Sequence, residues 1–171
     1  MVEFANYFKN MPLERIGFMH PNYVNKTMVS HHNVLWGNVY PATESNLALM
    51  NLDNISLPGL YMEIQELRKL VLPFPISFSP ELNSLQDLEN FYRNPENRIG
   101  KRCNDAFRNI MIKSNGEVIP SHGRCYNVVA GNLYQNNLKE IWNSAAIAQF
   151  RKDLIKSGGL MPACTRCCSA F

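Results

Sequence analysis

All five cysteines of the 171-residue chain lie after residue 102, at positions 103, 125, 164, 167 and 168. Cys164 and Cys167 have the CxxC spacing, which lets two thiolates turn toward one metal centre. Cys103 and Cys125 flank a predicted β-hairpin, so folding can bring them to the same end of the module. Four sulfurs fit either tetrahedral zinc or an iron–sulfur cluster, and the spacing does not separate these two centres. Cys168 is an alternate ligand.

Packing is the alternative interpretation of these cysteines. A buried cysteine behaves as a small hydrophobic residue, and this reading stays open for Cys103 and Cys125. The CxxCC segment at 164–168 has no apolar periodicity and lies near Pro162 and Arg166, which favours metal ligation. A thioredoxin-like redox pair is disfavoured, because the CxxC does not follow a strand and open a helix.

Composition excludes several classes of protein. Hydrophobic residues make up 46% of the chain and charged residues 18%, which is enough apolar material for a core and too little charge for a disordered chain. The net charge of +3 comes without a block of like charges, so nucleic-acid binding is not indicated. The apolar runs are too short to span a bilayer, and the first residues lack the features of a secretion signal. These observations predict a cytoplasmic protein with reduced cysteines and no membrane association.

Residues 1–100 predict strands and helices in alternation. Short apolar runs at 15–20 and 74–78 are typical of buried strands, and helical periodicity covers 25–36, 59–70 and a segment capped by Ser84. Such alternation indicates parallel pairing of the strands. Two parallel strands cannot close a barrel and leave both edges open, so we expect further strands from another chain or from the rest of a longer protein.

Residues 101–171 predict a small hairpin followed by helix. The polar stretch 94–101 marks the boundary between the two parts. Asn115–Gly116 between two apolar runs predicts a hairpin with a type I′ turn, which requires positive φ at both residues. Helical periodicity starts at Leu138, and Ser144 is a candidate cap for its continuation, which ends at Gly158–Gly159.

The order of motifs after residue 102 resembles the C-terminal auxiliary-cluster domain of radical SAM enzymes, which is called SPASM, or twitch in its shorter one-cluster form. The motifs are Cys103, the hairpin around Asn115–Gly116, Gly131–Asn132, the sequence EIWNS at 140–144, and Cys164–Cys167. The resemblance implies one auxiliary 4Fe–4S cluster that transfers electrons or anchors substrate. The implied ligands are Cys103, Cys125, Cys164 and Cys167, with Cys168 as the alternate.

A weaker resemblance extends to the first part of the chain. Residues 18–23 and 75–80 look like late strands of the partial α/β barrel of radical SAM enzymes. The implied fold is therefore a remnant of a parallel α/β barrel in residues 1–100, followed by a hairpin-and-helix SPASM or twitch module in 101–171. The implied partners are the missing N-terminal barrel portion, on this or another chain, and a peptide or small-molecule substrate, as in a maturase.

Two departures from the family pattern limit what is implied. The sequence contains no CxxxCxxC, so this chain alone is predicted to be inactive in S-adenosylmethionine cleavage, and that cofactor is expected only if the barrel front is supplied. Ser121 stands where the family has a cysteine, and a hydroxyl is a poor soft-metal ligand. Either Cys125 replaces that cysteine, or three thiolates share the cluster with an outside ligand. The alternative function is a non-catalytic, zinc-binding Cys₄ module for protein interaction.

The catalytic residues are not identified by the sequence, and a few polar residues remain as lesser candidates. His20 follows a strand, where barrel sites gather, but its place before a proline also suits a structural cap; Ser79 follows the same logic. His32 shares an apolar helical face and is expected to be packed. His122 is an alternative ligand near Cys125.

Arginines beside the cysteines are candidates for offsetting the charge of a cluster. Arg124 precedes Cys125, and Arg166 lies between Cys164 and Cys167. The alternative for each is a solvated surface arginine. Main-chain amides of the hairpin and of the loop at 127–131 are expected to donate hydrogen bonds to cluster sulfurs and thereby tune the potential.

Overall fold

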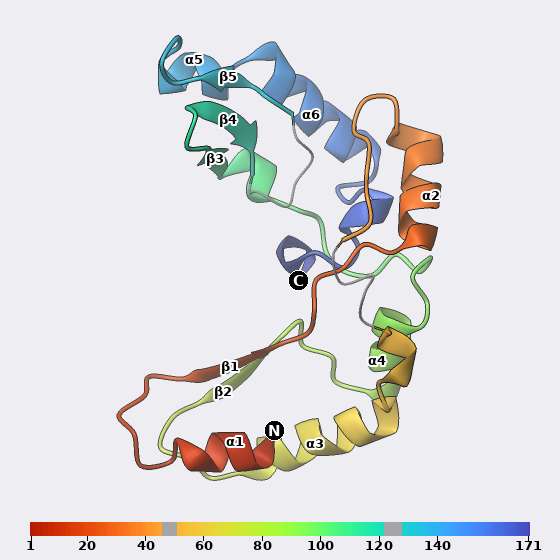
Figure 1. Ribbon diagram of the computed structural model, residues 1–171, viewed down its shortest axis with the longest axis vertical. Coiled ribbons are helices and arrows are strands. Elements are labelled where there is room, and N and C mark those ends of the chain that lie inside the picture. The colour runs from red at the N-terminus through yellow and green to blue at the C-terminus, as the bar shows by residue number, and fades with distance from the viewer. Residues whose placement is uncertain (46–50, 122–127) are drawn as a thin grey trace.

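The computed structural model describes residues 1–45, 51–121 and 128–171 of a mixed α/β protein (Figure 1). The first part contains α1 (Val2–Tyr7), β1 (Ile16–Met19), α2 (Lys26–Trp36), α3 (Leu57–Lys69), β2 (Ile76–Ser79) and α4 (Leu85–Tyr92). The second part contains β3 (Ile110–Ile112), β4 (Glu117–Pro120), β5 (Gly131–Asn132), α5 (Leu138–Trp142) and α6 (Ala145–Lys156). Short 3₁₀ turns are η2 (Leu52–Asn54), η3 (Asp105–Phe107), η4 (Pro162–Cys164) and η5 (Cys168–Ala170).

Strands β1 and β2 form a parallel pair, as the alternating pattern predicts. The register runs from Ile16 opposite Ile76 to Met19 opposite Ser79. Helices α1 and α3 lie along this pair at the bottom of Figure 1. Within the described ranges, β1 and β2 pair only with each other, so each keeps one unpaired edge. The remnant of a larger barrel stays a prediction that is compatible with these open edges.

The core of the first part is formed by the apolar faces of α3 and α4 against the strand pair. Ser84 caps α4 in a capping box with Asp87, as its sequence pattern predicts. Ser56 caps α3, which begins two residues before the predicted start. The most deeply buried residues of this core are Ala5, Met28, Ile64, Leu67, Leu88 and Phe91.

The hairpin of the second part forms, but its turn differs from the prediction. Lys113 N–H bonds to Glu117 O, so the loop contains the three residues 114–116. Only Gly116 of these residues has positive φ, at 80°, whereas a type I′ turn needs it at Asn115 as well. A three-residue loop with a left-handed glycine is the next most common hairpin connection and preserves the strand twist. Strand β5, which was not predicted from the sequence, adds a third antiparallel strand beside β4.

Helix α2 packs against the second part of the chain although it belongs to the first part in sequence. It lies beside α6 and the C-terminal segment in Figure 1, and it contacts η4. Tyr40, just after α2, is buried in a second core cluster with Ala106, Phe150, Leu154 and Met161. The domain boundary at residues 100/101 remains a prediction. The packing of α2 and Tyr40 brings residues from both sides of this boundary into contact.

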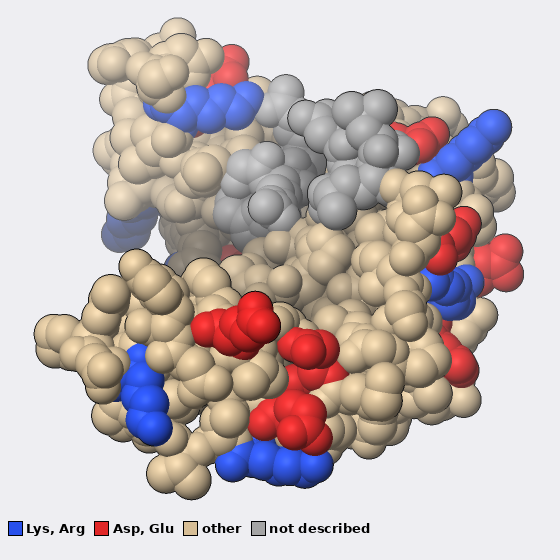
Figure 2. All heavy atoms as spheres, turned by 60° about the horizontal axis from the view of Figure 1, so that its bottom comes forward, with Lys and Arg blue, Asp and Glu red and all other residues tan. Residues whose placement is uncertain are grey.

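The surface carries both signs of charge, and uncharged residues cover most of the face shown in Figure 2. None of the helices in the described ranges is both long enough and apolar enough to cross a membrane.

Leu88→Ala is expected to destabilise the fold, because Leu88 in α4 has 0% of its surface exposed. A buried leucine replaced by alanine typically costs about 2–5 kcal/mol, because the cavity relaxes only in part. Val71, which is 90% exposed, provides the control, and Val71→Ala should change the free energy of unfolding by less than about 0.5 kcal/mol. Urea unfolding of the three proteins measures both effects; equal stability of all three would contradict this account of the core.

Candidate metal centre

Cys103 lies at the start of the second part, between the boundary segment and η3. Its main-chain N–H bonds to Gly159 O at 2.9 Å, which ties the residue to the chain just before the CxxC. Its side chain is half-buried. Burial raises the pKa of the Cys103 thiol, and the backbone N–H groups of Asp105 and Ala106 oppose that rise by hydrogen-bonding to the sulfur. Such N–H donors stabilise a thiolate, which is the form that binds metal.

Cys164 and Cys167 lie in a tight turn that starts at Pro162. Cys164 N–H bonds to Met161 O at 2.8 Å, and Cys167 N–H bonds to Cys164 O at 3.0 Å. The second bond folds the CxxC back on itself, as the spacing predicts. Both side chains are half-buried, as is that of Cys168 at the start of η5.

The structure brings Cys103 close to the CxxC turn. The side chains of Cys103 and Cys164 pack against the same core cluster, around Ala106 and Met161. Electrostatic interaction with Cys167 is among the causes that raise the pKa of Cys103, so the two side chains lie within electrostatic reach of each other. Three of the four predicted ligands therefore occupy one region, and Cys125 lies outside the described residues.

These cysteines fit an iron–sulfur cluster by donor chemistry. Thiolates are soft ligands, and both iron–sulfur clusters and zinc accept them. In the ranges that the structure describes, no three His, Cys, Asp or Glu side chains are close enough to hold a metal ion. The soft thiolate donors of Cys103, Cys164 and Cys167 suit either centre by their chemistry.

Ser121, which the resemblance aligns with a family cysteine, is buried directly after β4. It has positive φ, 66°, which is uncommon for a residue other than glycine. Its Oγ is buried and has no hydrogen-bond partner among the described residues. Its N–H bonds to Asn109 O at 3.1 Å. His122 and Arg124, candidates near Cys125, lie outside the described residues, as does Asn127 at the start of the loop expected to donate amides.

Arg166 is buried, with 1% of its surface exposed, so the solvated alternative for this residue is wrong. Its guanidinium donates to main-chain oxygens at the end of α4 and just beyond it. Nε bonds to Phe91 O at 2.8 Å, Nη2 to Asn90 O and Asn94 O at 2.7 Å each, and Nη1 to Asn97 O at 3.0 Å and Thr165 Oγ1 at 2.9 Å. These bonds fasten the CxxC turn to the first part of the chain.

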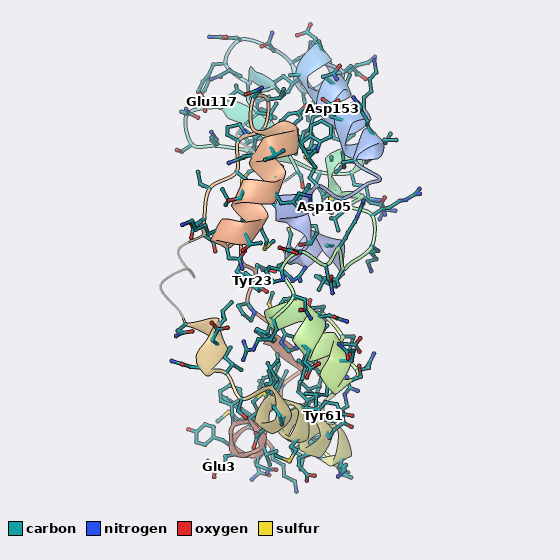
Figure 3. All side chains as sticks on the ribbon, turned by 90° about the vertical axis from the view of Figure 1, so that its right-hand side faces the viewer. Glu3, Tyr23, Tyr61, Asp105, Glu117 and Asp153 are labelled. Carbon is teal, nitrogen blue, oxygen red and sulfur yellow. The ribbon has the colours of Figure 1, made fainter. Side chains whose placement is uncertain are left out.

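Tyr23 completes the surroundings of Arg166. Its hydroxyl donates to Phe91 O, the carbonyl that also accepts from Arg166. The guanidinium carbon lies 5.6 Å from the centre of the Phe91 ring. Figure 3 shows Tyr23 at the narrow junction between the lower and upper parts of the molecule, with Asp105 above it. Sequence reasoning missed this junction; an arginine between two candidate ligand cysteines was its only signal.

His20 is buried at the carboxyl end of β1. Its Nδ1 lies 2.8 Å from the hydroxyl of Tyr92, and its Nε2 has no hydrogen-bond partner in the described part of the chain. Ser79 contributes its carbonyl oxygen, which accepts from the N–H of His20 at 2.8 Å. Burial lowers the pKa of His20, and Glu81 opposes this effect. These contacts show a structural role for His20 and leave its Nε2 available.

His32 is completely buried, as its apolar helical face predicts. Its Nε2 lies 2.7 Å from Tyr40 O, and its Nδ1 accepts from Ala163 N–H at 3.5 Å. A proton on Nε2 satisfies both contacts, and burial lowers the pKa of His32 and so favours this neutral form. His32 thereby connects α2 to the residue before Cys164.

A cavity of about 510 Å³ opens beside the CxxC turn. One face of α2, the boundary segment and the chain after α6 form its walls. Its lining includes Met28, Trp36, Arg98, Lys156, Pro162 and Thr165. It is large enough for a side chain or a small molecule.

Comparison with known families identifies the second part of the chain. Residues 103–168 match the SPASM family, an iron–sulfur cluster-binding domain. The matched SPASM segment begins at Cys103 and ends at Cys168, so it spans all five cysteines. No curated protein and no solved structure matches the chain.

The stability of the fold is expected to fall between pH 7 and pH 5, partly through His20. Because its pKa is lowered in the folded state, the unfolded chain takes up this proton first, near pH 6.5, and stability is lost as the pH falls below that value. His32 contributes in the same sense. His20→Gln should therefore reduce the loss without abolishing it, as measured by urea unfolding at both pH values. The same loss in His20→Gln and the unaltered chain would contradict the assignment to His20.

Proposed function

We propose that the SPASM segment binds one auxiliary 4Fe–4S cluster, with Cys103, Cys164 and Cys167 as ligands, and that the chain is the C-terminal part of a radical SAM enzyme. The observation that carries the proposal is the convergence of Cys103 with the CxxC turn inside the matched segment. The backbone N–H groups that bind the Cys103 sulfur support it further, because such donors stabilise cluster thiolates.

The fourth ligand in this proposal is Cys125. With Cys125 bound, the cluster is closed and suits electron transfer. With three thiolates only, one iron stays open for substrate. Ser121, buried in the position of the family's cysteine, does not supply a soft ligand.

The residues around the cysteines prepare this site for a cluster. When bound, the cluster supplies one-electron redox chemistry or a Lewis-acidic iron. The core residues next to Cys103 and Cys164 exclude water from one side of the site. The cavity beside Pro162 and Thr165 is the proposed approach for a peptide or small-molecule substrate.

The first part of the chain is proposed to complete a barrel with strands that residues 1–100 do not contain. The open edges of the β1–β2 pair support this proposal, because parallel strands require further neighbours or cover. In such a barrel His20 stands at the carboxyl ends of the strands, where active sites gather. In this proposal, S-adenosylmethionine and its cluster bind to the part of the barrel that supplies those further strands. The proposal places the protein in a reducing compartment such as the cytoplasm, where thiols stay available for iron.

Anaerobic reconstitution with iron and sulfide tests the ligand set. The unaltered chain should turn brown and contain equal amounts of iron and sulfide, whereas a colourless chain with one zinc would support the alternative Cys₄ module. Separate serine substitutions of Cys103, Cys125, Cys164 and Cys167 should each remove most of the iron, because a hydroxyl replaces a thiolate. Cys168→Ser is the matched control and should retain the iron content of the unaltered chain. Full iron in Cys125→Ser with loss in Cys168→Ser would show that the fourth ligand is Cys168.

The chain alone is expected not to cleave S-adenosylmethionine under reducing conditions, because residues 1–171 contain no CxxxCxxC. Chromatographic measurement of 5′-deoxyadenosine checks this, with an active radical SAM enzyme as the positive control. Production of 5′-deoxyadenosine by the pure chain would contradict the expectation.

A further inference from the structure

Arg166 is a buried cation that has no acidic partner in residues 1–45, 51–121 and 128–171. It forms no ion pair with any Asp or Glu of the described ranges, although only 1% of the residue's surface is exposed. Its hydrogen bonds go to carbonyl oxygens and to Thr165. Carbonyls satisfy the N–H donors but leave the positive charge, and a buried charge is costly unless an opposite charge lies nearby.

The end of α4 compensates this charge only in part. Asn90 and Phe91 lie in the last turn of α4, where the helix dipole supplies roughly half a negative charge. Arg166 lies between Cys164 and Cys167 in sequence, so its remaining positive charge is held within one side-chain length of the CxxC turn, although its guanidinium reaches the end of α4. Cluster thiolates and sulfides carry net negative charge, and the protein surroundings screen it little where water is excluded.

We propose that Arg166 is the buried counter-charge of the iron–sulfur cluster and raises its reduction potential, in addition to fastening the CxxC turn to α4. This inference rests on the proposed function. Reduction adds one electron to the cluster and makes it more negative. A nearby fixed positive charge stabilises the reduced state more than the oxidised state, so its removal lowers the potential.

Arg93 provides a matched control. Its guanidinium also binds main-chain carbonyls, at Leu52, Asp53 and Ile55, and it follows directly after α4. It is more exposed than Arg166 and lies 3.5 Å from the carboxylate of Asp53. Loss of Arg93 removes a comparable set of hydrogen bonds without removing an uncompensated buried charge.

The test is a redox titration of the reconstituted full chain, followed by electron paramagnetic resonance, in Arg166→Gln, Arg166→Lys and Arg93→Gln. Arg166→Gln should lower the equilibrium constant for reduction on the order of tenfold, which is about 59 mV for one electron. Arg166→Lys keeps the charge but not the planar fork, so its potential should stay close to that of the unaltered chain. Arg93→Gln should leave the potential unchanged.

Each outcome decides one claim. An unchanged potential in Arg166→Gln with full iron content would overturn the inference. If Arg166→Gln does not retain iron, Arg166→Lys distinguishes the two roles of the side chain. Iron retained by Arg166→Lys at the original potential supports the role of the charge. Loss of iron from Arg166→Lys as well shows that Arg166 is a structural anchor only. Absence of iron in the unaltered chain would instead refute the proposed function.

Discussion

The burial of one guanidinium, that of Arg166, organises the region where the two parts of the chain meet. A guanidinium loses strong hydration when it is buried, so its donors must find acceptors inside the protein. The carbonyls at the end of α4 and in residues 94–97 provide them, since the last turn of a helix has no partners for its own carbonyls. The N–H donors of the guanidinium and the free carbonyls of the helix end thus become each other's hydrogen-bond partners. These bonds fix the CxxC turn to α4.

The remaining contacts of the C-terminal segment serve the same arrangement. Cys103 bonds through its N–H to Gly159, and Lys101 bonds through its N–H to Ala170. His32 reaches Ala163 from α2. Contacts from three distant parts of the chain therefore hold a segment that has little regular structure of its own. These contacts fix the main chain around the cysteines that are the proposed ligands.

The first part of the chain presents the opposite situation. Helices α1 and α3 and the core around Leu88 stabilise the parallel pair, but β1 and β2 each keep one edge that pairs with no other strand of the described residues. The SPASM segment, in contrast, has its own three-stranded sheet and a core cluster of Val118, Ile141 and Ile147, and it shares a second cluster with Tyr40. This difference is compatible with the proposal that the β1–β2 pair is joined by further strands.

Local chemistry was readable from the sequence. The CxxC spacing, the capping box at Ser84 and the alternation of strands and helices depend on near neighbours, and the structure contains all three. The type of turn at Asn115 was not predicted correctly from the sequence, because two hairpin geometries suit the same residues. The register of the strands determines which of the two forms. Distant contacts decided the rest: α2 packs across the predicted boundary, and Arg166 is buried by carbonyls about 70 residues earlier in the chain. An arginine between two cysteines has the same local propensity on a surface or in a core, so only the tertiary structure determines whether its guanidinium meets water or the carbonyls at the end of α4.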